Sequence, residues 1–570
     1  MLFIGRAEHL PLLSREYLLA PWNGHLMPGS FAVVRLLDQL WPVSYVPVAI
    51  VDLSLQLVAG VLAYRLLVAL FGARAAILVP LSMFLFSPVT LPAFLWWAAA
   101  LNQLPGQVAM IGVLLLQVRY HRLGRTRDGV AGAMVLATGL LFSEKLLLVL
   151  PVVFALTLLF LSSGRPPARV RYAVRSSWRV WLAHLAVVVP YCVYYLSHVP
   201  SPVTRTPKGE VVLRTAWTAL TKAVLPGLLG GPWRWQQVGV GAIADPVEAV
   251  VVVSTVAAGL LVVVSVLRRR RAVFGWAVVA GYWLSTALLL GVTRAPYVGP
   301  VIGAEYRYST EVCIVVAVFG TAAFLPLHGP FRRGQAQRLA PRRRGRRPMA
   351  ASRQPLAAGA LCVAVVGASL VSTYQFDRFW RQNQAASYFA RARSDLATAH
   401  RPLTLVEMPL PPKVQQGFLG SFVHTSTVMS AFEPRPRFLT AGRSADELYM
   451  PDDTGHLRRV AVEGFPNRKG RSHGCGWRVE RQPVSIPLTR PTLPWRWTAR
   501  VGYLASEDAT ATVRVGSVTS MVRIRRGVNT LFVLGEGVVD SVDLTGLSRG
   551  ALCTDDVTVG SPRAVPYSHP

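Results

Sequence analysis

Four polar stretches interrupt an apolar sequence, and each contains residue types that can bind or transfer chemical groups. Their candidate residues are Glu8, Glu16 and His25 in the first stretch, Asn102 and Gln103 in the second, Glu144 and Lys145 in the third, and Arg294, Glu305, Tyr306, Arg307 and Tyr308 in the fourth. A carboxylate can take a proton from an attacking hydroxyl group. Lysine and arginine can hold the phosphate that leaves.

Each stretch taken alone also has a simple structural explanation. The first is a surface loop with an interfacial Trp22, and the second is an aromatic belt followed by a helix N-cap at Asn102. The third is a tight turn with a local ion pair, and the fourth is an interfacial anchor of Tyr and Arg. The four stretches together favour a shared site, because polar groups at membrane depth are costly and often functional.

The composition shows which elements must position these residues. Of 570 residues, 52% are hydrophobic and 15% are charged, and the mean hydropathy is +0.39. An ordinary soluble domain has about 25% charged residues. These values exclude a disordered chain, a coiled coil and a conventional cytosolic enzyme, and they indicate a polytopic membrane protein.

Ten apolar segments approach the roughly 17–25 residues that a membrane-spanning helix needs. They are 44–71, 76–91, 104–119, 129–143, 146–162, 181–197, 247–267, 273–291, 309–326 and 355–374. Four arginine clusters, at 119–127, 165–179, 268–271 and 342–347, then fall on one side, as cytoplasmic loops do. This distribution explains the net charge of +32 and argues against nucleic-acid binding. The four polar stretches lie on the opposite face.

The acidic residues divide the chain near residue 374, with eleven before it and seventeen from there onward. We expect an extracytoplasmic loop with an amphipathic helix at 1–43 and a transmembrane domain at 44–374. An extracytoplasmic α/β region follows at 375–480, and a β-sandwich-like domain at 481–570, where short β-branched runs alternate with turn residues. The expected fold class is a mainly α polytopic membrane bundle of about ten transmembrane helices, followed by this mixed α/β region and its β-sandwich-like end.

The five cysteines fall into two groups. Cys192, Cys313 and Cys362 lie in apolar segments and are expected to be small buried hydrophobic residues. Cys475 and Cys553 are the pair in the tail, and an extracytoplasmic tail predicts a disulfide between them. No Cys/His spacing typical of a zinc site occurs in the sequence, so no metal site is predicted.

The order of the motifs resembles the C-type (GT-C) glycosyltransferases, polytopic enzymes that use polyprenyl-phosphate sugars. A His-x-x-Pro element at 25–28 precedes an amphipathic helix, and polar residues precede Pro105 in a second outer loop. A lysine-containing hairpin follows at 139–145, and an Arg-Tyr element at 306–308 enters a late span. The resemblance covers about residues 1–330 and rests on short motifs. The Arg, Ala, Val and Gly bias is typical of GC-rich codon usage and suits an actinobacterial source.

The resemblance implies transfer of a sugar from a polyprenyl-phosphate donor to an extracytoplasmic glycan or lipid acceptor, in cell-envelope biogenesis at the plasma membrane. Residues expected at the donor phosphate are Lys145, Arg294 and Arg307. Residues expected at the substrate are His25, Asn102, Gln103, Glu144, Glu305, Tyr306 and Tyr308. A divalent metal ion is compatible with this chemistry, but the sequence demands no cofactor.

The sequence departs from the family at the catalytic acid, which is usually an Asp shortly after the first helix. No Asp precedes Asp38, so Glu8 or Glu16 is expected to take that role. An extracytoplasmic start also predicts that a first helix is missing from the chain, or else that the first span inserts as a reverse anchor.

The alternative is a non-catalytic envelope membrane protein or a transporter, whose tail binds a glycan or a protein partner. A transporter is expected to show inverted repeats and charges near the middle of the membrane. No internal repeat is evident, and the acids within the spans, Asp52 and Glu311, lie near span ends.

Overall fold

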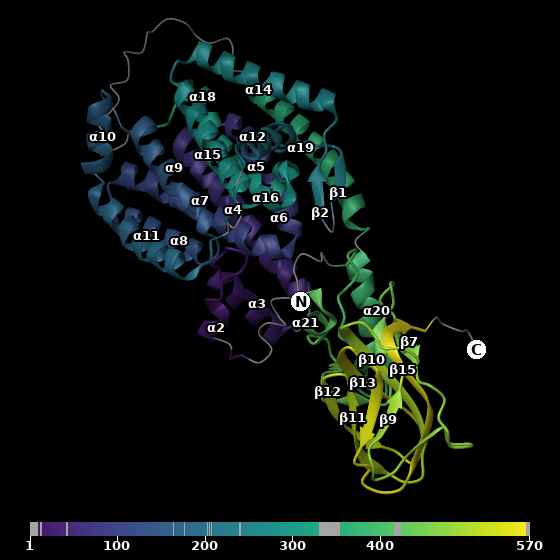
Figure 1. Ribbon diagram of the computed structural model, residues 1–570. Coiled ribbons are helices and arrows are strands. Elements are labelled where there is room, and N and C mark those ends of the chain that lie inside the picture. The colour runs from purple at the N-terminus through teal and green to yellow at the C-terminus, as the bar shows by residue number, and fades with distance from the viewer. Residues whose placement is uncertain are drawn as a thin grey trace, which may run out of the picture. The chain divides into compact units, whose positions relative to one another are not determined.

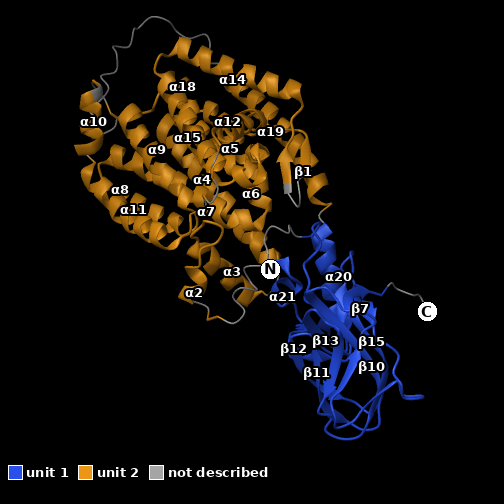
Figure 2. Ribbon diagram, in the orientation of Figure 1, with its two compact units in different colours: residues 1–9, 383–570 blue, residues 10–382 orange. Residues whose placement is uncertain are grey.

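The computed structural model describes residues 10–565, except for 12–13, 42–43, 163–164, 176, 202, 204–205, 207, 239–240, 330–353, 383 and 415–422. Glu8 therefore lies outside the described residues. The described chain forms two compact units, a helical unit up to Gln382 and a β-rich unit after it (Figures 1 and 2).

Among the described residues, eight helices are long and apolar enough to cross a membrane. They are α4 (Val46–Phe71), a segment of η1 (Ala75–Ile77), α5 (Leu78–Phe86), η2 (Pro88–Thr90) and α6 (Leu91–Leu95), then α7 (Trp97–Leu123), α11 (Trp178–His198), α14 (Glu248–Arg268), α15 (Ala272–Thr293), a segment of η7 (Tyr306–Ser309), α17 (Val312–Val315), η8 (Val316–Gly320) and α18 (Thr321–Phe324), and α19 (Gln354–Trp380). Eight such helices are consistent with a multi-pass membrane protein.

The predicted count of ten spans is not confirmed. The predicted span 129–143 corresponds to α8 (Thr126–Leu140), whose 15 residues are fewer than the roughly 17–25 that a crossing helix needs. The predicted span 146–162 corresponds to three short consecutive elements, η3 (Glu144–Leu148), α9 (Val149–Ala155) and the π-helical η4 (Leu156–Phe160). The prediction rested on the number of apolar residues. That number does not show that the backbone changes helix type within this stretch.

Shorter elements connect the long helices. They are α2 (Arg15–Leu18), α3 (Pro28–Leu40), α10 (Pro166–Arg175), α12 (Gly209–Thr218), η5 (Ala219–Val224), α13 (Leu225–Leu228), β1 (Trp235–Val238), β2 (Gly241–Ala244), α16 (Ala295–Val298) and η6 (Pro300–Ala304). The amphipathic helix expected before residue 43 is α3, which buries Phe31 and Val34. Proline at its first position suits a helix start, since that N–H has no helical partner.

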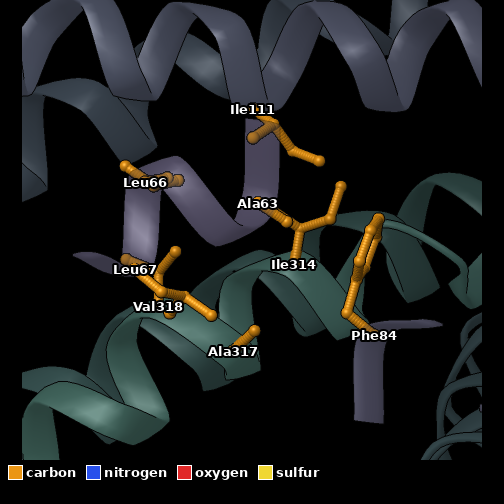
Figure 3. Close-up of a pocket in the computed structure, with 8 residues that line it drawn as sticks. All are labelled: Ala63, Leu66, Leu67, Phe84, Ile111, Ile314, Ala317 and Val318. Carbon is orange, nitrogen blue, oxygen red and sulfur yellow. The ribbon is translucent and has the colours of Figure 1, made fainter. Parts of the chain in front are cut away.

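The core of the helical unit is closely packed around α7. Gly139 of α8 lies so close to α7 that a Cβ atom there would be 2.5 Å from that of Ala109. A void of about 10 Å³ remains in this core, with room for about one water-sized sphere (Figure 3). Its lining is entirely apolar and is drawn from α4, α5, α7, α17 and η8, so we regard it as a packing gap and not a binding site.

The β-rich unit begins with α20 (Gln384–Thr398) and also contains α21 (Thr425–Met429). Its strands are β3 (Thr404–Leu405), β4 (Arg437–Phe438), β5 (Ser444–Ala445), β6 (Tyr449–Pro451), β7 (Leu457–Pro466), β8 (Trp477–Val479), β9 (Val484–Pro487), β10 (Trp495–Ala505), β11 (Ala509–Val515), β12 (Val518–Ile524), β13 (Gly527–Gly537), β14 (Ser541–Thr545) and β15 (Leu552–Ala564). The described strands form one sheet in the order β4-β3-β6-β7-β15-β10-β13-β5, with β8 beside β15, and a second in the order β12-β11-β14-β9.

The two sheets share one buried cluster of aliphatic side chains. Val501 of β10 pairs with Leu531 of β13 and Val557 of β15, and all three are buried with Val513 of β11. The alternation of buried and exposed residues along β11 is the pattern of a strand with one face in a core. The disulfide between Cys475 and Cys553 is confirmed, and it joins the loop before β8 to β15.

Candidate active site

The first polar stretch forms a tight turn that presents His25. Trp22 and His25 exchange two backbone hydrogen bonds of 2.9 and 2.8 Å across the turn. The central residues, Asn23 and Gly24, have φ angles of 51° and 81°. Asn-Gly is the dipeptide that best tolerates such left-handed positions, which explains why the chain turns here.

The turn is held by Arg294, which directly follows α15, and by a side chain of α11. The Arg294 guanidinium donates to the Asn23 side-chain oxygen at 2.9 Å and to the Asn23 carbonyl at 2.8 Å. The Tyr195 hydroxyl in α11 donates to the Gly24 carbonyl at 2.6 Å. The following helix, α3, is fixed by a bond of 2.8 Å from the Gly29 amide to the Leu141 carbonyl. The N-terminal segment is thus anchored to the residues that immediately precede Glu144.

His25 lies between a carboxylate and a guanidinium. Its Nδ1 is 2.7 Å from Oε1 of Glu144, and its Nε2 is 2.9 Å from Nη2 of Arg294. Because a guanidinium can only donate, Nε2 must accept and the imidazole proton lies on Nδ1, directed at Glu144. The second carboxylate oxygen of Glu144, Oε2, is buried and has no hydrogen-bond partner among the described residues.

Glu144 is held in its ionised form. Burial alone would raise the pKa of Glu144, but its pairing with His25 and the nearby charge of Arg294 lower that pKa below its usual value. The result is a group whose carboxylate form is favoured and whose Oε2 has no partner among the described residues. We refer to Asn23, His25, Glu144, Tyr195 and Arg294 as the Glu144 network.

A second network begins at the next residue, Lys145. Its ammonium group donates to Oε2 of Glu311 at 2.6 Å and to the Tyr308 carbonyl at 2.9 Å. Both side chains of this ion pair are largely buried. Lys145 therefore joins the hairpin after α8 to the late helical segment that starts at η7. Since Glu144 and Lys145 are consecutive, the two networks meet at this hairpin.

Arg307 provides the other cation of the second network. Its guanidinium lies 4.2 Å from the ring centroid of Trp96 and 4.9 Å from that of Tyr308, whose hydroxyl is 3.2 Å away. The carboxylate of Glu305 is 3.8 Å distant, and burial raises the pKa of Glu305 while Arg307 opposes that rise. The Nε atom of Arg307 is buried without a hydrogen-bond partner within the described chain. The Arg307 network, as we call Trp96, Lys145, Glu305, Arg307, Tyr308 and Glu311, thus retains a donor that an anion could use.

The other predicted site residues belong to neither network. Asn102 and Gln103 are in the second turn of α7, and their side-chain oxygens are buried without partners in the described part of the chain. Tyr306 is fully buried with its ring against Trp235, 5.1 Å between centroids. Glu16 is exposed on α2. The predicted roles of all these residues stay predictions.

Sequence reasoning missed four members of the two networks. Asn23 carried a usable signal, since Asn-Gly between polar residues predicts a tight turn. Trp96 belongs to the aromatic pair Trp96-Trp97, but nothing in the sequence indicates that its ring contacts the Arg307 guanidinium. Tyr195 and Glu311 lie inside or at the edge of apolar spans, and nothing in their local sequence indicates which distant loop they contact.

Among the described residues, no three His, Cys, Asp or Glu side chains lie close enough to hold a metal ion. The neighbours of the Glu144 carboxylate are His25, whose second nitrogen is already occupied, and the positively charged Arg294. Such a donor set does not fit a divalent cation. The chemistry is therefore derived below from side chains alone.

Comparison with known proteins gives distant structural neighbours. No protein-family model and no curated protein matches the sequence. Two solved structures of the arabinofuranosyltransferase AftD from Mycobacteria are similar in outline, the second being a mutant. Each is 11% identical in sequence to this chain. The TM-scores are 0.32 and 0.28, and the matches cover 94% and 93% of this chain. The chain spans about half of each, 54% and 56%. These neighbours are glycosyltransferases, but a shared activity does not follow from so distant a likeness.

Proposed function

We propose that the chain is an integral membrane glycosyltransferase of the C type. It moves a sugar from a polyprenyl-phosphate donor to a hydroxyl group of an extracytoplasmic glycan or lipid, in building the cell envelope. The observation that supports this most directly is Glu144, whose lowered pKa favours the carboxylate and whose Oε2 has no partner in the described chain, next in sequence to a lysine of a network with an incompletely satisfied Arg307. A base and a phosphate site are the two elements that the transfer requires.

In this mechanism Glu144 is the general base. Its Oε2 accepts the proton of the acceptor hydroxyl as that oxygen attacks the anomeric carbon of the sugar. The bond between the anomeric carbon and the phosphate oxygen breaks, and the phosphate leaves with the electron pair. His25 donates to the other carboxylate oxygen and so orients Glu144, and Arg294 fixes the tautomer of His25. Glu144 suits this role better than Glu16, which is exposed on α2.

Arg307 is the proposed phosphate ligand. Its guanidinium is kept rigid against Trp96, and its Nε lacks a partner in the described residues, so it can donate to the departing phosphate. Lys145 forms an ion pair with Glu311. Its positive charge is expected to stabilise the departing phosphate whether or not Lys145 keeps Glu311 as its partner. Three of the five N–H groups of Arg294 are directed at Asn23 and His25, and these contacts fix its orientation, so we assign it to positioning and not to the phosphate.

The test is transfer by membranes that contain the full chain, supplied with a panel of labelled polyprenyl-phosphate sugars and a cell-envelope glycan acceptor. Glu144→Gln is expected to lower the rate at least 100-fold without weakening donor binding, because it removes only the base. Arg307→Lys is expected to raise the KM for the donor about tenfold, since lysine loses both the planar contact and the fork of donors.

Glu16→Gln is the matched control, an acid of the same type on an exposed helix, and it is expected to keep full activity. Full transfer by Glu144→Gln would remove Glu144 from the mechanism. If the unaltered chain transfers no sugar from any donor of the panel, the proposed function is wrong.

A further inference from the structure

A cavity of about 370 Å³ lies in the helical unit, lined by residues of α3, α4, α7 and α8 and by Phe142. Its volume is within the range of about 300–1,000 Å³ that is usual for small-molecule sites. The wall is mainly aliphatic and aromatic. Among its described residues, only Asp52 and Thr138 have an oxygen atom in the side chain.

Asp52 is the unusual member of this wall. It lies in the second turn of α4, it is 2% exposed, and neither of its carboxylate oxygens has a hydrogen-bond partner in the described structure. Tyr45, the residue immediately before α4, does not supply one, because its hydroxyl is directed at the Leu95 carbonyl. A carboxyl group buried in apolar surroundings without a partner carries a free-energy cost, because it has lost its hydrogen bonds to water. A bound molecule with a hydrogen-bonding group would remove that cost.

The cavity reaches the apolar exterior of the helices at its other end. Thr138 is exposed there, and its hydroxyl donates to the Met134 carbonyl at 3.0 Å while both lone pairs remain able to accept. Met134 and Leu141, on either side of Thr138 in the sequence, are also exposed. Together with Thr138 they make an exposed, mainly apolar edge beside the cavity wall. A hydrocarbon chain can contact such an edge while its polar end lies at Asp52.

We propose that this cavity binds a neutral lipid that carries a hydroxyl group, with its hydrocarbon chain along the apolar wall and its hydroxyl at Asp52. A phosphate or carboxylate head is excluded because the described wall contains no cationic side chain to offset its desolvation. An ammonium head is excluded because bringing its charge from water into a mainly apolar wall costs more than bringing a neutral hydroxyl. A hydroxyl needs one partner, can donate to or accept from Asp52, and enters an apolar cavity at the lowest desolvation cost.

This lipid site is separate from the Glu144 network, although the two are neighbours. Phe142 contributes to the cavity wall and precedes Ser143-Glu144 directly. The same ring lies against α3, where a Cβ at Gly29 would be 2.8 Å from it. The inference rests on the cavity and on Asp52, and it holds whether or not the chain transfers a sugar.

The experiment uses the purified full chain in detergent with two photoreactive probes, a diazirine-bearing hexadecanol and the corresponding hexadecane. The alcohol is expected to label peptides from 46–71, 97–123 and 126–142, and excess unlabelled hexadecanol is expected to compete. Asp52→Leu is expected to lower labelling by the alcohol at least tenfold and labelling by the alkane less than twofold. Val51→Phe narrows the cavity with Asp52 retained, so it is expected to lower labelling by both probes.

Two further variants make the outcome decisive. Glu248→Leu, which removes an exposed acid at the start of α14, is expected to leave all labelling unchanged. Asp52→Asn keeps a hydrogen-bonding group of the same size and is expected to retain at least half of the alcohol labelling, which covers the case in which Asp52→Leu does not fold. Equal labelling of the unaltered chain by both probes, or undiminished alcohol labelling of Asp52→Leu, would overturn the proposal.

Discussion

At the scale of single residues, the protonation state of Glu144 depends on His25 and, through His25, on Arg294. Arg294 occupies Nε2 of His25, which leaves the imidazole proton on Nδ1, and that proton is donated to Glu144. The carboxylate is thereby stabilised against the effect of burial, and its pKa is lowered. A base with a lowered pKa is weaker but stays ionised over a wider pH range.

This state predicts how activity depends on pH. Since the pKa of Glu144 is lowered, the carboxylate form and the activity that needs it are retained above that pKa and are lost as the pH falls through it. In His25→Asn the pairing is weakened and burial dominates, so the pKa rises and the acid limb of the rate profile moves to higher pH. The measurement is the transfer rate from pH 4 to 8 for both proteins. An acid limb at the same pH in His25→Asn would show that His25 does not control Glu144.

At the scale of elements, the tight turn at Asn23-Gly24 determines where His25 lies. Gly24 has a φ of 81°, a region that costs other residues about 1–2 kcal/mol. We expect Gly24→Ala to displace His25 and lower transfer at least tenfold, while the midpoint of thermal unfolding falls by only a few degrees. Gly209→Ala is the matched control, because a Cβ there meets no atom within 4 Å and its φ is not left-handed. Equal rates for the two alanine variants would contradict this role for the turn.

The elements also show what the sequence could predict. Long apolar runs indicated the eight helices that are long enough to span a membrane, but also two segments, 129–143 and 146–162, that are not. The amphipathic helix expected before residue 43 is α3. Both signals are local in the sequence. The pairing of His25 with Glu144 and of Lys145 with Glu311 joins residues 119 and 166 positions apart. Such contacts depend on how helices pack, and one sequence contains no periodicity that specifies them. The same limit applies to Asp52, because the sequence does not show that its carboxylate faces a cavity without a hydrogen-bond partner in the described structure.

At the scale of the whole molecule, the two units differ in what holds them together. The helical unit buries apolar side chains between its helices, whereas the β-rich unit buries a mainly aliphatic core that two sheets share. Its disulfide closes a loop between residues 78 positions apart. Closing such a loop restricts the unfolded chain and stabilises the folded unit, typically by about 2–4 kcal/mol.

The disulfide gives a prediction that separates the two units. We expect Cys475→Ser to lower the free energy of unfolding of the β-rich unit by about 2–4 kcal/mol, seen as earlier proteolysis of residues after 383 on heating of the full chain. The helical unit is expected to be unaffected, since its stability comes from its own core. Cys362→Ser, which removes a free half-buried thiol in α19, is the control and is expected to leave both transitions in place. If both units melted together at a lower temperature in Cys475→Ser, they would form one cooperative body, and the disulfide would stabilise the whole molecule.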